Sequence, residues 1–259
     1  MHLRPRDMYL LTVSSWVVVC IFAALPFLLT LHTSVADAFF ESMSGITATG
    51  STVLSGLDDM SPGILIWRSL LHWLGGIGLP LLRIGGMRLF QTESSDRSQK
   101  VMPRSHMVAR LIVTAYVGIT ILGTLAFWWA GMSLFDAVNH AMSAISTGGF
   151  STSDQSLAKW HQPAVHWVAV VVMILGSLPF TLYVATLRGH RKALLKDQQV
   201  QGLLGLLLVT WLVLGTWYWW TTDLHWLEAL RHVALNVTSV VTTTGFALGD
   251  RSEERLRAG

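Results

Sequence analysis

The sequence has little charge and almost no cysteine. Asp, Glu, Lys and Arg make up 13% of its 259 residues, against roughly 25% in soluble domains. With 52% hydrophobic residues and a mean hydropathy of +0.50, the composition excludes an ordinary soluble domain and indicates a membrane protein. The single cysteine, Cys20, lies in an apolar run, so an internal disulfide is excluded and the redox compartment stays open.

No cleavable signal peptide, metal-binding pattern or nucleic-acid patch is evident in the sequence, and we expect none. The apolar run Met8–Leu29 follows a basic start but is 22 residues long, which exceeds a signal h-region. The ten histidines show no set of three or four closely spaced ligands, so we expect no histidine metal site. The pI of about 9.3 comes from loops between apolar runs, which indicates topology and not nucleic-acid binding.

Five apolar runs are long enough to cross a membrane, since a spanning helix needs about 20 residues. They are Met8–Leu29, Ile64–Leu82, Val108–Trp129, Ala164–Leu187 and Leu203–Trp220. Basic residues gather at the N-terminus and in the loops 83–110 and 188–201, whereas acidic residues gather in the loops between them. By the positive-inside rule, we expect the N-terminus and both basic loops on the cytoplasmic side.

Three segments between these runs are too short to cross and too apolar for plain loops. They read DAFFESMSGITATGSTVLSGLDD, FDAVNHAMSAISTGGFSTSD and LEALRHVALNVTSVVTTTGFALGD. Each begins with an acid near an apolar helical stretch, reaches a Ser/Thr-rich glycine turn and returns to a polar loop. This pattern predicts a short helix followed by an extended return, which together form a re-entrant hairpin.

The three turns also predict an internal repeat. They align on Gly50, Gly148 and Gly245, which are 98 and 97 residues apart. Nine residues before each glycine stand the polar residues Glu41, Asn139 and Asn236, for which we expect a shared structural hydrogen-bonding role.

Irregular backbone is tolerated at membrane depth only where it is buried in protein or lines a watery cavity. Glycine permits positive φ, so loops around a common axis can present carbonyl oxygens that replace the water shell of a cation. The C-terminal end of each preceding short helix adds partial negative charge. The pattern therefore favours a cation-permeation pore.

The strings DAFFESMSGITATGSTVLSGLD, HWLGGIG, RIGGMRLF, AGMSLFDAVNHAMSAISTGGFST and SVVTTTGFALGD, in this order, resemble TrkH-like pore subunits of the bacterial Trk/Ktr potassium-uptake superfamily. The resemblance runs from about Arg4 to Asp250. It implies an all-α integral membrane fold of repeated span–short pore helix–filter loop–span units, with about five transmembrane helices and three re-entrant pore helices. The units are a first pore repeat at 4–90, a second at 104–190, an incomplete third at 200–250 and a charged tail at 251–259.

The resemblance further implies one filter strand from each repeat, built around Gly50, Gly148 and Gly245. The strands consist of Thr47, Ala48, Thr49, Gly50 and Ser51, then Ile145, Ser146, Thr147, Gly148 and Gly149, then Thr242, Thr243, Thr244, Gly245 and Phe246. The implied function is potassium transport across a bacterial inner membrane, with no catalytic residue. Glycine at position 50, where sodium-permeable relatives carry serine, favours potassium. The implied partners are membrane lipid, a second copy in a homodimer, and a cytosolic nucleotide-binding gating subunit that docks on the two basic loops.

The sequence departs from the four-repeat pattern of that family. Two spans before the first repeat, the inner helix after the third filter and the whole fourth repeat have no counterpart, and we expect the first inner helix to be shortened. Three strands cannot close a ring of four, so either another chain supplies the missing part or the chain is truncated, which we favour. The alternative function is a non-conducting remnant or scaffold that associates with full-length subunits. An intramembrane enzyme is disfavoured, because the serines within the spans have no evident catalytic partner apart from His72 near Ser69, and no GxSxG motif occurs.

Several charged residues carry two interpretations each. Arg68 and His72 lie four residues apart on one helix face, and a charge within a span is a functional candidate. We favour instead snorkelling of Arg68 to the outer interface. Glu41 either attracts cations to the filter mouth or pairs with a backbone amide. The acids after the filters either form an acidic vestibule or are ordinary solvated residues of the loops; these acids are Asp58, Asp59, Asp154 and Asp250.

Overall fold

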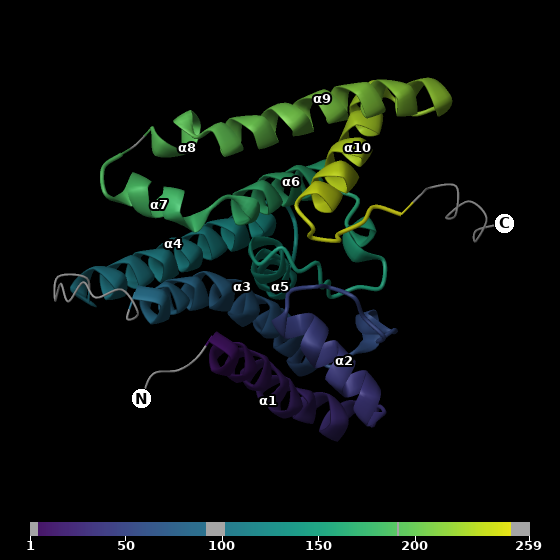
Figure 1. The fold of residues 1–259 in the computed structure, drawn as a ribbon. Helices are drawn as coiled ribbons and strands as arrows, with labels where there is room; N and C mark the ends of the chain where they lie inside the picture. The colour runs from purple at the N-terminus through teal and green to yellow at the C-terminus, as the bar shows by residue number, and fades with distance from the viewer. Residues whose placement is uncertain (1–4, 92–101, 191, 250–259) are drawn as a thin grey trace.

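The computed structural model describes residues 5–91, 102–190 and 192–249. Within these ranges the secondary structure is helical throughout, with no strand. Long helices make up most of the molecule, and shorter ones lie between them (Figure 1). The expected all-α membrane architecture is confirmed.

Three long helices have apolar stretches of sufficient length to cross a membrane. They are α1 (Pro5–Leu31), α4 (Met102–Trp129) and α9 (Gln198–Thr221), with spanning stretches at Val13–Leu31, Met107–Trp129 and Gln198–Thr221. Their apolar side chains face outward, since Phe22, Leu122 and Val213 are 66%, 66% and 62% exposed. An apolar outer surface of this kind requires lipid around it.

The first inner helix is not shortened, contrary to the sequence-based expectation. Helix α3 runs from Pro62 to Gln91 over 30 residues, which is about 45 Å at 1.5 Å per residue. Its glycines lie within the helix and allow it to approach a neighbour closely. A Cβ on Gly75 would collide with the carbonyl oxygen of Ile46, and one on Gly76 would lie 2.7 Å from Ser146 Cβ.

The predicted continuous span Ala164–Leu187 is broken in the structure. Helices α6 (Pro163–Ser177) and α7 (Phe180–Leu187) meet at an angle of 87°. Leu178 is extended at the break, with ψ 147°, because the following Pro179 disfavours the helical conformation there. The Tyr183 hydroxyl donates to the carbonyl oxygen of Leu175 at 2.6 Å, so a carbonyl freed by the break keeps a partner.

The three predicted short helices are present as α2 (Val35–Ile46), α5 (Leu134–Ile145) and α10 (Trp226–Val241). The first two share one N-cap. The hydroxyls of Ser34 and Ser133 accept from the amides of Asp37 and Asp136 at 3.1 Å, and each donates to the same aspartate's carboxylate at 2.7 Å. These are favourable helix starts.

Helix α5 forms the centre of the molecule (Figure 1). Ala137, Ala141 and Ala144 are fully buried on it and pack in one cluster with Tyr116 of α4 and Met173 of α6. The small alanines let the surrounding helices approach closely. Short connecting helices complete the fold: η1 (Leu57–Asp59), η2 (Ser156–Lys159) and α8 (Ala193–Lys196).

Candidate functional site

The same backbone turn follows each of the three short helices. The helix ends in a residue at φ −84°, −78° and −84°, the next residue has φ between 52° and 58°, and a glycine two residues later has φ between 82° and 89°. The residues in these three positions are Thr47, Ala48 and Gly50, then Ser146, Thr147 and Gly149, then Thr242, Thr243 and Gly245. Positive φ at the last position explains why it is glycine each time.

One hydrogen bond closes each turn. The amides of Thr49, Gly148 and Thr244 donate to carbonyls five residues earlier, those of Ser44, Ser143 and Ser239, at 2.9, 2.9 and 2.8 Å. Each turn therefore bonds back to a carbonyl at the C-terminal end of its helix, as in a Schellman motif.

The structure corrects the alignment of the second repeat by one residue. Gly149, not Gly148, matches Gly50 and Gly245 in conformation, and the spacing between the repeats is 99 and 96 residues. The second turn therefore comprises 146–150. Ile145 is the last residue of α5, and Phe150 belongs to the turn although the sequence-based set omitted it. Aligning STGGF with TTTGF on its final Gly-Phe gives this register.

The turns pack against one another head to tail. A Cβ on Gly50 would collide with the carbonyl oxygen of Gly148, and a Cβ on Gly149 would collide with that of Thr244. These two carbonyls occupy equivalent positions, each immediately before the positive-φ glycine of the next repeat's turn. Among the described residues, no heavy atom lies within 4 Å of a Cβ placed on Gly245. Such a directional contact, repeated, is how consecutive members of a ring pack.

Inner helices support the ends of the short helices from behind. A Cβ on Gly75 of α3 would collide with the carbonyl oxygen of Ile46, the last residue of α2. A Cβ on Gly176 of α6 would lie 2.7 Å from the carbonyl oxygen of Ile145, the last residue of α5. Glycine on each inner helix thus admits the backbone of its own repeat's short helix.

A polar residue on each short helix holds the chain that returns from the turn. In the corrected register these residues are Glu41, His140 and Asn236. The bonds are Thr52 Oγ1 to Glu41 Oε1 (2.9 Å), Val53 N to Glu41 Oε2 (3.2 Å), Ser151 Oγ with His140 Nε2 (3.0 Å) and Leu248 N to Asn236 Oδ1 (3.0 Å). Asn139, which the sequence-based alignment had chosen, instead donates to Phe135 O at 2.7 Å within its own helix.

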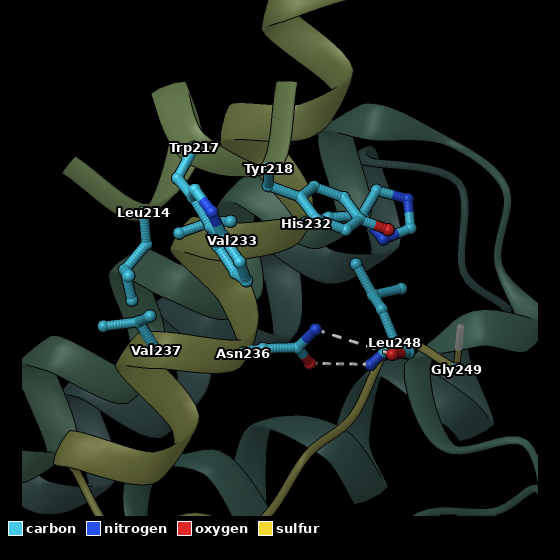
Figure 2. A pocket seen from close by; sticks show the side chains of 9 residues that line it. All are labelled: Leu214, Trp217, Tyr218, His232, Val233, Asn236, Val237, Leu248 and Gly249. Carbon is cyan, nitrogen blue, oxygen red and sulfur yellow. Dashed lines mark hydrogen bonds between the residues drawn. The ribbon is translucent and has the colours of Figure 1, made fainter. Parts of the chain in front are cut away.

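The bond from the Leu248 amide to Asn236 lies beside a hollow of about 300 Å³ between α9 and α10 (Figure 2). Figure 2 shows the Asn236 amide bonded to the backbone of Leu248 at its lower edge. Trp217 and Tyr218 of α9 line the upper part. The return segment of the third turn is therefore a wall of this hollow.

Arg68 does not snorkel, contrary to the favoured interpretation of the sequence. Its side chain is 1% exposed and its Nε lies 2.8 Å from Oε1 of Glu41, which is 0% exposed. Neither carboxylate oxygen of Glu41 faces solvent, and Oε2 accepts from the backbone amide of Val53, as one of the two interpretations of the sequence expects. Because each buried charge has the other as a partner, neither needs to reach water.

The acids that follow the first two turns connect the loops. Asp154 Oδ2 accepts from the amides of Gly56 and Leu57 at 2.9 and 3.1 Å. Asp58 Oδ2 accepts from the Ser153 hydroxyl at 2.9 Å and the Asp154 amide at 3.2 Å. Burial raises the pKa of Asp58, but these bonds and one from Lys159 outweigh it, so the pKa lies below its ordinary value.

Taken together, the fold and the site define a multi-pass helical membrane protein whose re-entrant helices end in glycine turns packed head to tail. A family model described as "Cation transport protein", TrkH, matches residues 1–245. The chain belongs to the TrkH family.

Individual relatives agree with this membership. The chain is 48% identical to the Trk system potassium uptake protein TrkI of Halomonas elongata, over 96% of this chain and 53% of that protein. It is 36% identical to the Trk system potassium uptake protein TrkH of Vibrio parahaemolyticus, over 95% and 55%. The crystal structure of the potassium transporter TrkH from that organism superposes with a TM-score of 0.84 at 32% identity, over 95% and 53%. The chain thus spans about half the length of the curated relatives it matches.

Proposed function

We propose that this chain is a pore-forming part of a Trk-type potassium uptake system, and that its three glycine turns form part of a potassium filter. The observation that carries the proposal is the head-to-tail packing of Gly50 on Gly148 and of Gly149 on Thr244. We infer the identity of the ion from the relatives, which are named for potassium uptake and not for catalysis.

The proposed filter consists of the turns in their corrected register, at 47–51, 146–150 and 242–246. Backbone carbonyls in these turns replace the water shell of a potassium ion as it enters. The C-terminal ends of α2, α5 and α10 stand directly before the turns, so their partial negative charges favour a cation there. Hydroxyl oxygens add to this at two helix ends, where the Thr47 and Thr49 Oγ1 atoms, and those of Thr242 and Thr244, lie 2.8 Å apart.

The proposed setting is a bacterial inner membrane with the N-terminus in the cytoplasm. In Figure 1, α8 and the beginning of α4 lie at one end of the molecule, whereas η1 and η2 lie toward the other. The exposed basic residues Arg110, Arg188, Lys192 and Lys196 fall at the former end, which supports a cytoplasmic assignment by the positive-inside rule. The same end is the proposed docking side for a cytosolic nucleotide-binding subunit, and the proposed assembly is a homodimer.

A second candidate function is a non-conducting scaffold that associates with full-length subunits. The open side of Gly245 favours it, because the third turn packs on no further turn within the described residues. Exposed filter backbone is costly in lipid, so either function requires that other protein cover this side.

Potassium-limited growth of an uptake-deficient bacterium tests the proposal. The chain is expressed alone and together with a separate polypeptide that carries the remaining half of a relative such as the Halomonas elongata TrkI. Rescue by the pair, lost on Gly149→Ala but kept on Gly56→Ala, supports the filter. Gly56 is the matched control, because it also has positive φ (74°) but no atom near its Cβ position. No rescue by the pair, with both chains present in the membrane, contradicts the potassium-pore function and favours the scaffold.

A further inference from the structure

Arg68 contacts two repeats at once, although it belongs to the inner helix of the first. Its Nε donates to Glu41 Oε1 at 2.8 Å, and its Nη2 donates to the Thr52 hydroxyl at 3.1 Å. Its Nη1 donates at 3.1 Å to the carbonyl oxygen of Ser151, the residue after the second turn. One buried guanidinium group therefore joins the return segments of adjacent repeats.

The same helix face holds the last side chain of the second turn. The ring of Phe150 lies between Arg68, whose Cζ is 4.1 Å from the ring centroid, and His72, whose ring stacks on it at 3.9 Å and 16°. The His72 Nδ1 atom lies 3.3 Å from Ser143 Oγ on α5, and a Cβ on Gly148 would collide with the His72 ring. Because Arg68 and His72 are one helical turn apart, one face of α3 fixes both the backbone and the final ring of the second turn.

The second inner helix, α6, lacks this arrangement. Gly75 of α3 and Gly176 of α6 occupy equivalent places at the ends of their short helices and are 101 residues apart. The same spacing matches Arg68 with Ala169, which is fully buried and carries no hydrogen-bond donor on its side chain. The second inner helix therefore cannot hold the third turn as the first holds the second.

Hydrogen-bond donors held rigidly at this position fix the carbonyl oxygens that an ion would contact. Discrimination between K⁺ and Na⁺ depends on how carbonyl oxygens from different turns are spaced and on how firmly they are held. A guanidinium group offers donors in a fixed planar fork, which an ammonium group cannot reproduce. Because the Glu41 carboxylate neutralises the guanidinium, the pair adds rigidity without placing an unpaired positive charge beside a cation path.

We propose that Arg68 is a positioning residue of the filter, which fixes the spacing between the first and second turns by binding Glu41 and Ser151 together, and thereby sets the preference for K⁺ over Na⁺. The spacing role follows from the contacts alone. The ion preference rests on the proposed potassium-pore function.

The test uses the full chain, reconstituted in lipid nanodiscs together with the polypeptide that carries the remaining half of a relative, and two variants of the chain that leave no unpaired buried charge. Arg68→Lys keeps the charge but loses the fork, and the double variant Glu41→Gln with Arg68→Gln removes both charges. Hydrogen–deuterium exchange is followed in residues 47–56, 146–154 and 242–249. We expect both variants to speed exchange about tenfold in the first two segments, the effect of losing roughly one charge-assisted hydrogen bond. The third segment should not change.

The control variant is Asn236→Ala, which removes the bond to Leu248 N and should speed exchange in residues 242–249 only. If Arg68→Lys changes residues 47–56 but leaves 146–154 at the wild-type rate, Arg68 is a support of its own repeat and the proposal is wrong. Uniform acceleration in all three segments would also overturn it, because that is the signature of general destabilisation.

The ion preference is measured on the same samples. Wild-type exchange in the three segments is titrated with KCl and with NaCl, and the ratio of the two half-effect concentrations is compared with that of Arg68→Lys. We expect wild type to prefer K⁺ and the variant to lose about tenfold of that preference. A wild-type chain that responds equally to both salts would contradict the potassium filter while leaving the spacing result intact. A wild-type preference that Arg68→Lys preserves would overturn the selectivity part of this proposal alone.

Discussion

The two junctions between successive turns have the same backbone contact but different side chains. At the first junction, Arg68 and Glu41 form a buried ion pair that also binds Ser151. At the second junction, the ring of Phe246 is 2% exposed and lies 5.6 Å from the ring of His140. Turn geometry of this kind therefore does not require buried charge, and the ion pair at the first junction needs a reason of its own.

The turn glycines of the second and third repeats provide a second comparison. Gly149 and Gly245 have nearly the same φ, 82° and 89°, but within the part of the chain that the structure describes only Gly149 of the two faces a carbonyl of a following turn. A side chain at position 149 would cause both backbone strain and a collision with the Thr244 carbonyl. A side chain at position 245 would cause backbone strain alone. Substitutions can distinguish the first junction from the second, and Gly149 from Gly245. The expected effects range from several kcal/mol to a slight change.

The largest effect is expected from removing one member of the ion pair. Arg68→Met leaves the Glu41 carboxylate buried and without its guanidinium partner, so the free energy of unfolding should fall by about 3–5 kcal/mol. Adding Glu41→Gln should restore most of the stability, because no charge then remains buried. Both are measured by denaturant unfolding in mixed micelles. Equal stability of the single and double variants would show that the pair is not energetically coupled.

Gly149→Ala is expected to be the next most harmful. A non-glycine residue at positive φ costs about 1–3 kcal/mol, and collision with the Thr244 carbonyl adds about 1–3 kcal/mol. Gly245→Ala should incur only the first cost, so unfolding should separate the two variants by about 1–3 kcal/mol. If they are equally destabilised in the isolated chain, the head-to-tail contact does not exist in solution.

Asn236→Ala should have a moderate effect on the segment that returns from the third turn. It removes the acceptor of the Leu248 amide, at a cost of about 0.5–1.5 kcal/mol. Leu248 is buried, so its amide has no ready replacement in water. The control is Val237→Ala, because Val237 lines the same hollow but its side chain forms no hydrogen bond. This variant measures the effect of lost packing alone. The unfolding midpoints of the two variants are compared with wild type.

The sequence predicted the repeated unit but not what fixes its details. Composition and run length are local, so the spans at α1, α4 and α9 and the three short helices could be predicted. The break at Pro179 was missed, because the run around it stays apolar and only the bond geometry of the proline ends the helix. The alignment on Gly148 arose because Thr147-Gly148 resembles the Thr-Gly pairs of the other turns, whereas the φ angle and the Gly-Phe pair shared with the third turn both identify Gly149.

Arg68 could not be placed from the sequence for a different reason. A lone arginine near the end of an apolar helix fits both snorkelling and burial, and the choice depends on Glu41, which lies 27 residues away. Likewise Asp58 and Asp154 are 96 residues apart, so their bonds between loops have no local signal. Contacts between repeats, as opposed to features within a repeat, require the folded structure.

The smallest effect is expected from a change of pH on the contacts between the loops that follow the first and second turns. The pKa of Asp58 is lowered in the folded chain from an ordinary value of 3.8, so its contribution is complete above that value and is lost as the pH falls through the lower, folded pKa. Its ion pair with Lys159 is about 40% exposed on both sides, so solvent screens it and the effect on stability should be slight. Amide exchange at residues 153–155, corrected for intrinsic rates, should rise at pH below 3.8, and Asp58→Asn should abolish that rise. A rise that persists in Asp58→Asn would show that Asp58 is not the source of the loop's acid sensitivity.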